Sequence, residues 1–249
     1  MSHHSTTFHN QLLSQLPAEE ARILAPHLEW VELPRDFLIV GPGQDIAHIY
    51  FLEEGIGSIV AVSPEGQKAE AGMFGPEGFA PIPPTVGSTK SFHEVCIQSA
   101  GYGHRLDIRL LAGLMHVCPE LYQLLVKSSH NLATQVSYTA LSNAIHQVNE
   151  RLARWLLMCH DRIGQDELTI THDYIALMLG VRRPSVTTAL HVLEGNRFLR
   201  NERGRVFMRD RIAMEEFAKD AYGIPEDEHR LLFKPVASSP SVTVLQRSG

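Results

Sequence analysis

Arginines are the side chains of this sequence best suited to binding chemistry, and they gather in one stretch of it. Between positions 180 and 211 the chain carries eight arginines and three acids, a local net charge of +5, whereas the whole chain carries −6. The arginines are Arg182, Arg183, Arg197, Arg200, Arg203, Arg205, Arg209 and Arg211. Guanidinium groups bind phosphates and guanine edges in a bidentate way, so one basic segment in an acidic chain indicates a local contact with nucleic acid.

The spacing of small and apolar residues in this region predicts a helix-turn-helix over residues 171–194. Ala176 is the small residue needed where two helices cross closely, and Gly180 can take the positive φ that the turn requires. Val186 is the apolar residue by which the second helix packs on the first. The rest of the expected small core is Leu179, Val181, Leu190 and Leu193.

The start of the second helix holds the candidates for reading DNA bases. This helix is expected to begin near Arg183 or Pro184, because proline fits the first turn of a helix. Its N-terminal half is the part that enters a major groove, and it presents Arg183, Ser185, Thr187 and Thr188. Arg183 is the candidate for bidentate contact with a guanine edge.

A β-hairpin wing is predicted after this helix, with strands near 197–200 and 205–208 and a turn at 201–204. Arg203 and Arg205 in the wing are expected to contact phosphates. For Arg182 two interpretations stay open, a phosphate contact and simple solvation.

The residues before position 119 have the pattern of a β domain. Apolar runs at 30–33, 37–40, 48–52 and 58–62 alternate with turn signals such as Glu54–Gly55 and the glycines and prolines of 75–84. Strands about 8–12 residues apart are typical of an antiparallel sandwich or barrel, here a small jelly roll. The fold class expected is α+β: an N-terminal antiparallel β-roll, a long dimerisation helix and a C-terminal winged helix-turn-helix. The boundaries expected are a helical arm of two short helices at 1–27, the β-roll at 28–118, the dimerisation helix at 119–146, the winged helix-turn-helix domain at 147–222 and a weakly ordered tail at 223–249.

Two helices are predicted between Pro119 and Gly164, because no glycine or proline lies between them. The first spans about 119–145. Its apolar stripe is Leu121, Leu125, Leu132, Val136 and Leu141. A seam against a second subunit is favoured for this narrow stripe, and packing on the chain's own β domain is the alternative. The second helix, about 148–163, is expected to turn one apolar side toward a core.

The sequence resembles the Crp/Fnr superfamily of bacterial regulators over about residues 8–222. The resemblance is strongest in the run Asn-Glu-Arg-Leu-Ala-Arg-Trp-Leu-Leu at 149–157 and in the 171–194 motif, and weaker at 50–55 and 75–78. It implies a cyclic-nucleotide-binding-type β-roll, a long dimer helix and a winged helix-turn-helix that binds a two-fold DNA site. A sequence-specific transcription regulator is therefore expected.

The sequence departs from the pattern of the cyclic-AMP receptors at the ligand site. Those proteins hold the cyclic phosphate with a Gly-Glu pair and, about ten residues on, an Arg followed by Ser or Thr. Here Glu77 supplies the acid, but His93 and Glu94 stand at the Arg-Ser position. The effector pocket is assigned to Glu77, His93 and Ser137, with an effector other than cyclic AMP. Pro184 replaces the Glu that often follows the reading arginine, so the DNA sequence read is expected to differ.

Bulk properties are those of a water-soluble cytoplasmic protein. The chain is 44% hydrophobic and 20% charged, has no apolar run of about 20 residues and begins without a signal-peptide pattern. Cys96, Cys118 and Cys159 lie far apart, which argues against a zinc or iron–sulfur site; Cys96 with His93 leaves a haem-binding alternative open.

The partners expected are double-stranded DNA and a second copy of the chain, with RNA polymerase and an unknown small effector as further candidates and no membrane. No catalytic residue, metal or cofactor is assigned. Two alternatives remain: a regulatory module that binds protein, and a cupin-like metal enzyme. The second would need a His-x-His pair, whereas His48, His93 and His104 stand singly.

Overall fold

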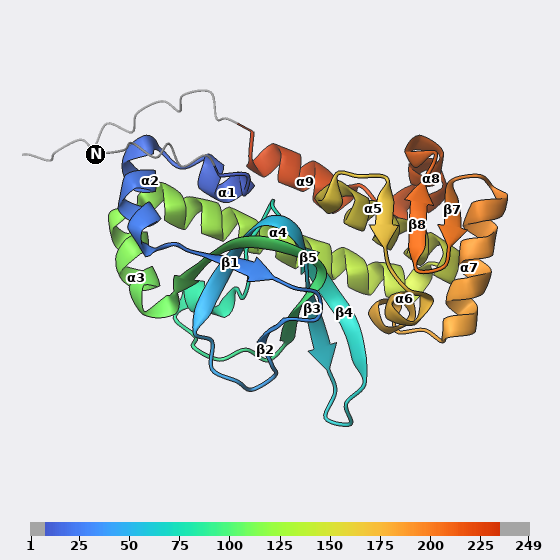
Figure 1. Ribbon diagram of the computed structural model, residues 1–249, viewed down its shortest axis with the longest axis horizontal. Coiled ribbons are helices and arrows are strands. Elements are labelled where there is room, and N and C mark those ends of the chain that lie inside the picture. Colours follow the sequence, from blue (N-terminus) through green and yellow to red (C-terminus); the bar gives the residue numbers. More distant parts are fainter. Residues whose placement is uncertain (1–7, 235–249) are drawn as a thin grey trace, which may run out of the picture.

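The computed structural model describes residues 8–234, and in this part of the chain two antiparallel sheets are connected by helices (Figure 1). The helices are α1 (Gln11–Ser14), α2 (Ala18–Leu24), η1 (Ala25–His27), η2 (Pro83–Val86), α3 (Ile108–Val117), α4 (Pro119–Ile145), α5 (Val148–Ile163), α6 (His172–Leu179), α7 (Arg183–Gly195), α8 (Arg211–Ala218), η3 (Lys219–Ala221) and α9 (Ile224–Leu232). The strands are β1 (Glu29–Leu33), β2 (Leu38–Val40), β3 (His48–Val62), β4 (Lys68–Phe74), β5 (Glu94–Asp107), β6 (Glu167–Thr169), β7 (Leu199–Glu202) and β8 (Arg205–Met208).

The larger sheet has the order β1-β5-β3-β4, with β2 also pairing to β5. Long strands β3 and β5 form its centre, and every pairing is antiparallel. The expected fold class, mixed α and β with an antiparallel N-terminal sheet and a C-terminal helix-turn-helix, is confirmed.

One detail of the β domain differs from the sequence-based prediction. The runs at 48–52 and 58–62 were expected to be separate strands with a turn at Glu54–Gly55, but they are the two halves of β3. Gly55 takes φ +100, and the pairing with β5 shifts register on both sides of it. Gly55 forms a bulge and does not end the strand, because β5 is long enough to pair with β3 on both sides of it.

The N-terminal arm forms two short helices separated at Pro17, as predicted, and polar contacts tie it to the β domain. Asn10 is fully buried; its side chain caps α1 and donates to the carbonyls of Leu52 and Gly78 at 2.9 and 3.0 Å. The carboxylate of Glu53 accepts from the backbone N–H groups of His9 and Asn10. Buried polar groups are thus paired across the junction, which holds the arm against the sheet.

Helix α4 spans Pro119–Ile145, as the sequence predicted, and runs beside the sheet toward the C-terminal part of the chain (Figure 1). Pro119 occupies the first turn, and Glu20 from α2 accepts hydrogen bonds from the N–H groups of Glu120 and Leu121 at 3.1 and 3.0 Å. A carboxylate at this end satisfies free N–H groups and favours the helix dipole.

Helix α5 is buried on more than the one side that was expected. All residues from Leu152 to Cys159 are buried, including the guanidinium-bearing Arg154. Helix α5 is buried on several sides because it packs on β3 as well as on α7 and α8. One hydrophobic cluster joins Ile56, Val60 and Met73 of the larger sheet to the core of the C-terminal part. The two halves of the chain therefore share a core in this structure.

The expectation of a weakly ordered tail from residue 223 is corrected for its first part. Residues 224–232 form α9, which packs on α4 and lies above it, to the left of α5, in the view of Figure 1. Asn131 of α4 donates to the carbonyl of Pro225 at 2.8 Å and to Glu228 at 3.0 Å. Pro225 lies in the first turn of α9, where a proline does not break a helix. Residues 235–249 of the expected tail lie outside the described residues.

Candidate nucleic-acid interface

The helix-turn-helix forms where the spacing predicted it. Thr171 caps α6 through its hydroxyl oxygen, which accepts from the N–H of Tyr174 at 3.2 Å. Gly180 ends α6 with φ +62, a left-handed conformation that glycine adopts without the strain of a side chain. Helix α7 then begins at Arg183 with Pro184 in its first turn, in agreement with the sequence.

The core that fixes the angle between α6 and α7 is made by the predicted apolar residues. Ala176 and Leu179 of α6 are buried, as are Val186, Leu190 and Leu193 of α7. Burying an aliphatic side chain of this size contributes roughly 1.5–3 kcal/mol, so the contact holds α7 rigidly. Val181 is packed against the same cluster but only partly buried.

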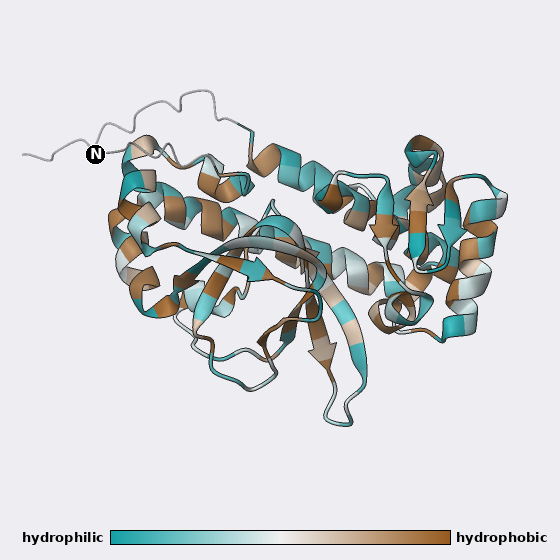
Figure 2. Ribbon diagram, in the orientation of Figure 1, coloured by the Kyte–Doolittle hydropathy of each residue, from teal (hydrophilic) through white to brown (hydrophobic). Residues whose placement is uncertain are grey.

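The opposite face of α7 is open. Arg183, Ser185 and Thr188 are exposed, and the Arg183 side chain retains 64% of its accessible surface. Its only described ion pair joins Nε to Asp173 of α6 at 3.4 Å, and that carboxylate is also exposed. An exposed pair contributes about 0–1 kcal/mol, so Arg183 can leave it at little cost for a partner outside the protein. Figure 2 shows hydrophobic and hydrophilic bands alternating along α7.

Thr187 differs from the other three candidates because its hydroxyl contacts a side chain of another helix, whereas the hydroxyl of Thr188 bonds only to the carbonyl of Pro184 in its own helix. The Thr187 hydroxyl lies 3.1 Å from Nδ1 of His172, whose Nε2 is 3.3 Å from the side-chain oxygen of Asn201 on β7. His172 therefore connects α7 to the wing, a positioning role that the sequence analysis missed. His191, exposed on α7 about one turn beyond Thr188, lies on the same open side of the helix and was not among the candidates taken from the sequence. The amphipathic pattern of residues 183–195 predicts that His191 faces solvent. The spacing of the sequence does not predict the contacts of His172 with Thr187 and Asn201.

The wing is the hairpin β7–β8 of a three-stranded sheet with the order β6-β8-β7. Arg203 and Gly204 make its turn, and Arg203 is exposed with no ion pair to any described residue. Arg205 is half exposed and pairs with Glu167 at 3.3 Å and with Glu202 at 3.5 Å. Of the two predicted phosphate contacts, only Arg203 is therefore free of internal partners.

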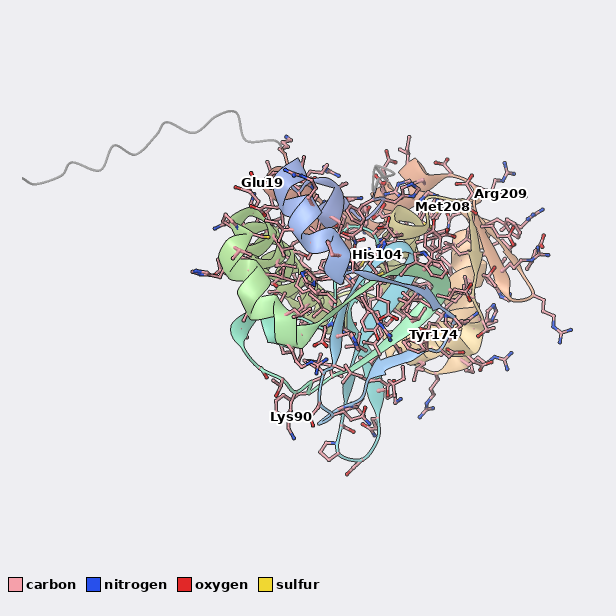
Figure 3. All side chains as sticks on the ribbon, turned by 60° about the vertical axis from the view of Figure 1, so that its left-hand side comes forward. Glu19, Lys90, His104, Tyr174, Met208 and Arg209 are labelled. Carbon is pink, nitrogen blue, oxygen red and sulfur yellow. The ribbon has the colours of Figure 1, made fainter. Side chains whose placement is uncertain are left out.

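Arg182, for which two interpretations were open, precedes α7 as its N-cap residue and is exposed. Figure 3 shows nitrogen-tipped side chains reaching outward from the C-terminal part of the chain, in the region where Arg209 is labelled. A basic surface of this kind suits a polyanion.

A comparison with family models supplies the decisive match. Residues 150–217 match the model described as the Crp-like helix-turn-helix domain. This segment is a Crp-like helix-turn-helix domain. It contains β6, α6, α7, the wing and nearly all of α5 and α8, and thus the whole surface described above.

Solved structures of low sequence identity share the fold of the chain. A Crp/Fnr-family transcriptional regulator from Eubacterium rectale has a TM-score of 0.64 at 17% identity, over 83% of this chain and 97% of that one. The c-di-GMP-responsive global regulator CLP of Xanthomonas campestris has 0.65 at 16% identity, over 77% and 99%. FixK2 of Bradyrhizobium japonicum has 0.65 at 13% identity, over 76% and 96%. No curated protein matches the sequence.

The domain match and the fold together confirm the predicted resemblance to the Crp/Fnr superfamily, and with it the predicted class of DNA-binding transcription regulators. None of the helices within residues 8–234 is long and apolar enough to cross a membrane. The same residues contain no cluster of three or more His, Cys, Asp or Glu side chains able to hold a metal.

The three residues assigned to an effector pocket are not brought together. His93 lines a cavity of about 460 Å³ between the β domain and α4. Glu77 instead forms an ion pair with Arg162 of α5 at 2.7 Å and lines a different cavity. Ser137 is exposed on α4 and donates to the carbonyl of Ala133 in its own helix.

Proposed function

We propose that the chain binds a two-fold DNA site as a homodimer, with α4 as the dimer seam and α7 as the helix in the major groove. The observation that carries this is a surface of coiled-coil spacing on α4 that is exposed at Tyr122, Val126, Ala133 and Ala140 and borders the cavity beside α4 at its middle, combined with a helix-turn-helix whose reading face is open. A single helix-turn-helix contacts only a few base pairs, and pairing two of them supplies the specificity that a genome demands.

The proposed seam shares only Val136 with the predicted stripe of α4. Leu121 and Leu125 are fully buried in the core of the chain's own β domain, so they cannot contact a second subunit. The exposed or half-exposed residues that recur at steps of four and three are Tyr122, Val126, Ser129, Ala133, Val136 and Ala140. A repeat of 3.5 residues is the coiled-coil pattern, and the small residues among them permit close approach of two helices.

Base reading is assigned to Arg183, Ser185, Thr187 and Thr188, as the sequence predicted. Arg183 exchanges its weak pair with Asp173 for bidentate contact with a guanine edge, which contributes roughly 1–3 kcal/mol of discrimination. The hydroxyl of Thr187 already has partners in His172 and in the carbonyl of Arg183, so its share in reading is smaller.

Phosphate contacts are assigned to Arg182, Arg203 and Arg205. Arg203, at the tip of the wing, is exposed and forms no ion pair with any described residue, so it loses no contact within the protein when it binds a phosphate. The same holds for Arg182. Arg205 must leave Glu167 and Glu202 to reach a phosphate. Contacts of this type fix the orientation of the protein on the duplex and carry no base preference.

The cavity beside α4 supports an effector other than a cyclic nucleotide. Its lining is mostly aliphatic, from Ile59, Ile82, Val95 and Leu132 among others, with His93 and two serines as the polar members. No arginine or lysine of the described chain lines it, so a cyclic phosphate would enter an apolar space without a cation.

Selection of bound fragments from genomic DNA, followed by sequencing, tests the proposal. The expected result is an enriched motif with two inverted halves whose centres lie about one turn of DNA apart. Binding of the full motif should be at least about tenfold tighter than binding of one half alone. Recovery of no common motif, or of a motif without two-fold symmetry, would contradict it.

A further inference from the structure

A second cavity lies where all parts of the chain meet, away from both the DNA-reading face and the apolar cavity. It has a volume of about 270 Å³, close to the lower end of small-molecule sites. Glu77 comes from the β domain, Asn131 and Gln135 from α4, Arg162 from α5, and Arg211 from the start of α8. Helix α9 covers it with Pro225, Glu226, His229 and Arg230.

The charges around this cavity are balanced. Its charged lining groups are Glu77, Asp161, Glu226, Arg162, Arg211 and Arg230. Two of the acids are neutralised locally, because Glu77 pairs with Arg162 at 2.7 Å and Asp161 pairs with Arg211 at 2.6 Å. Equal numbers of both signs concentrate neither anions nor cations, so a neutral or zwitterionic ligand fits this cavity best.

Glu226 is the acid of this cavity that has no direct ion pair among the described residues, although the positive charges of Arg162 and Arg154 act on it. One of its oxygens accepts from the backbone N–H of Gly223 at 3.0 Å, and no described side chain forms an ion pair with it. Burial is the largest influence on this group and raises the pKa of its carboxyl. A partly buried carboxylate of this kind gains from a ligand that brings a positively charged donor.

Two buried nitrogen atoms of residues that line the cavity have no hydrogen-bond partner, Nε of Arg162 and Nε2 of His229. Arg162 has a side chain only 8% exposed; its Nη atoms bond to Glu77 and to the carbonyls of Met158 and Met73, and its Nε has no partner. Arg230 pairs only with Asp227 one turn earlier on α9. Buried polar atoms are nearly always paired in native proteins, so unpaired ones around a cavity indicate a missing polar group.

We infer that this cavity binds a small zwitterionic metabolite of the amino-acid type, with its ammonium group on Glu226 and its carboxylate facing Arg162 and Arg230. The volume suits such a molecule; its ammonium group meets the carboxylate of Glu226, which has no direct ion pair, and its carboxylate can accept from the unpaired Nε of Arg162, whose charge Glu77 already balances. The site joins the β domain, the DNA-binding domain and α9, so its occupant contacts both functional halves of the chain at once. This inference does not require that the chain binds DNA.

The test is a melting-temperature measurement on the full chain without DNA. The probes are the protein-forming L-amino acids. Each is compared with two analogues: the matching amine, which lacks the α-carboxylate, and the matching acid, which lacks the α-amino group. One or more amino acids should raise the melting temperature with increasing concentration, by about 5–10 °C at about 100 times Kd. The matching amine and acid should have little effect at the same concentration, because each leaves one charged partner unmet.

Glu226→Gln and Glu228→Gln provide matched variants on the same helix. Glutamine at 226 keeps an oxygen for the Gly223 N–H and loses only the charge, so the fold is retained. It should weaken the affinity measured by calorimetry about 10–100-fold. Glu228 contacts Asn131 and Thr134 and does not line the cavity, so its variant should bind as the wild type does. The inference is overturned if no amino acid shifts the melting temperature, if the acid alone does so equally, or if Glu226→Gln binds unchanged.

Discussion

Trp155 on α5 donates its indole N–H to the carboxylate of Glu70 on β4, with 2.8 Å between Nε1 and Oε1. The other carboxylate oxygen accepts from the hydroxyl of Ser58 on β3 at 2.7 Å. Gln98 of β5 extends this buried cluster to Cys159 of α5, whose sulfur lies 3.3 Å from Nε2. The DNA-binding domain is thus joined to the β domain by buried polar contacts as well as by shared apolar packing.

This relationship predicts a pH dependence of stability. Burial raises the pKa of Glu70 from 4.5 to about 7, so the folded chain holds this proton more tightly than the unfolded chain does. The stability contributed by the protonated group is full below about pH 4.5 and is lost as the pH rises through about 7. Glu70→Gln stays neutral at every pH. Relative to wild type it should therefore gain on the order of 3 kcal/mol in free energy of unfolding between about pH 4.5 and pH 8.

Urea unfolding of both proteins over this pH range measures the difference, and the titration of all other groups cancels in the comparison. Glu94→Gln is the control, because Glu94 lies nearer the surface in an ion pair with Lys68. If wild type and Glu70→Gln differed by a constant amount at every pH, the carboxyl of Glu70 would not titrate in this interval.

Helix boundaries could be predicted well because they depend on local signals. Pro119 and Gly164 mark the outer ends of α4 and α5, and both helices have the predicted bounds. Gly180 and Pro184 marked the turn of the helix-turn-helix for the same reason. These residues restrict the backbone directly, whatever packs around them.

Features that depend on distant partners could not be predicted. Gly55 looks like a turn residue, and only the length of β5 makes it a bulge. The apolar stripe containing Leu121 and a second stripe containing Val126 both lie on α4, and periodicity does not say which one the β domain covers. Pro225 lies in the segment that the sequence predicts to be weakly ordered, whereas it stands in the first turn of α9, on a surface offered by α4.

Arg183→Ala should flatten the base preference at one position in each half-site. The loss of a bidentate guanine contact removes roughly 1–3 kcal/mol of discrimination, and the broken pair with Asp173 costs little because both groups are exposed. Sequencing of selected DNA pools gives the preference directly. Arg209→Ala is the matched control, since Arg209 is exposed but follows β8 at the end away from the wing tip. A wild-type preference in Arg183→Ala would show that another residue reads the base.

Arg203→Ala should weaken binding to all DNA sequences alike. Removing one phosphate contact lowers the slope of log K against log salt by about 0.9. Arg205→Ala should have a smaller effect, because the free energy of its contacts with Glu167 and Glu202 is given up on binding. Fluorescence anisotropy with specific and scrambled duplexes over a series of salt concentrations separates the two variants. A loss restricted to one sequence would make Arg203 a base-reading residue.

Cyclic AMP and cyclic GMP at millimolar concentration should leave both melting temperature and DNA affinity unchanged. The cavity beside α4 offers His93 but no lysine or arginine to a cyclic phosphate, and Glu94 follows it in the chain. Placing the phosphate there would leave its charge unpaired in apolar surroundings. A rise in melting temperature that saturates with either nucleotide would require a cation that this cavity does not present.

Val126→Asp should convert the dimer to monomers that still fold. Val126 is 42% exposed in the single chain, so the substitution leaves the protomer core intact. In a dimer joined along Tyr122, Val126, Ala133 and Ala140, the new carboxylate would be desolvated without a partner, which costs several kcal/mol. Val117→Asp is the control, because Val117 is 55% exposed at the end of α3 and lies off this seam.

Sedimentation equilibrium over a range of concentrations measures the assembly of all three proteins, and a gel shift measures their binding to the full two-fold site. Wild type and Val117→Asp should be dimers at micromolar concentration and bind the full site tightly. Val126→Asp should sediment as a monomer and bind the full site hardly better than a half-site, because two reading helices are no longer held about one turn of DNA apart. A monomeric wild type would exclude α4 as a seam, and a dimeric Val126→Asp with full affinity would place the subunit contact on another surface.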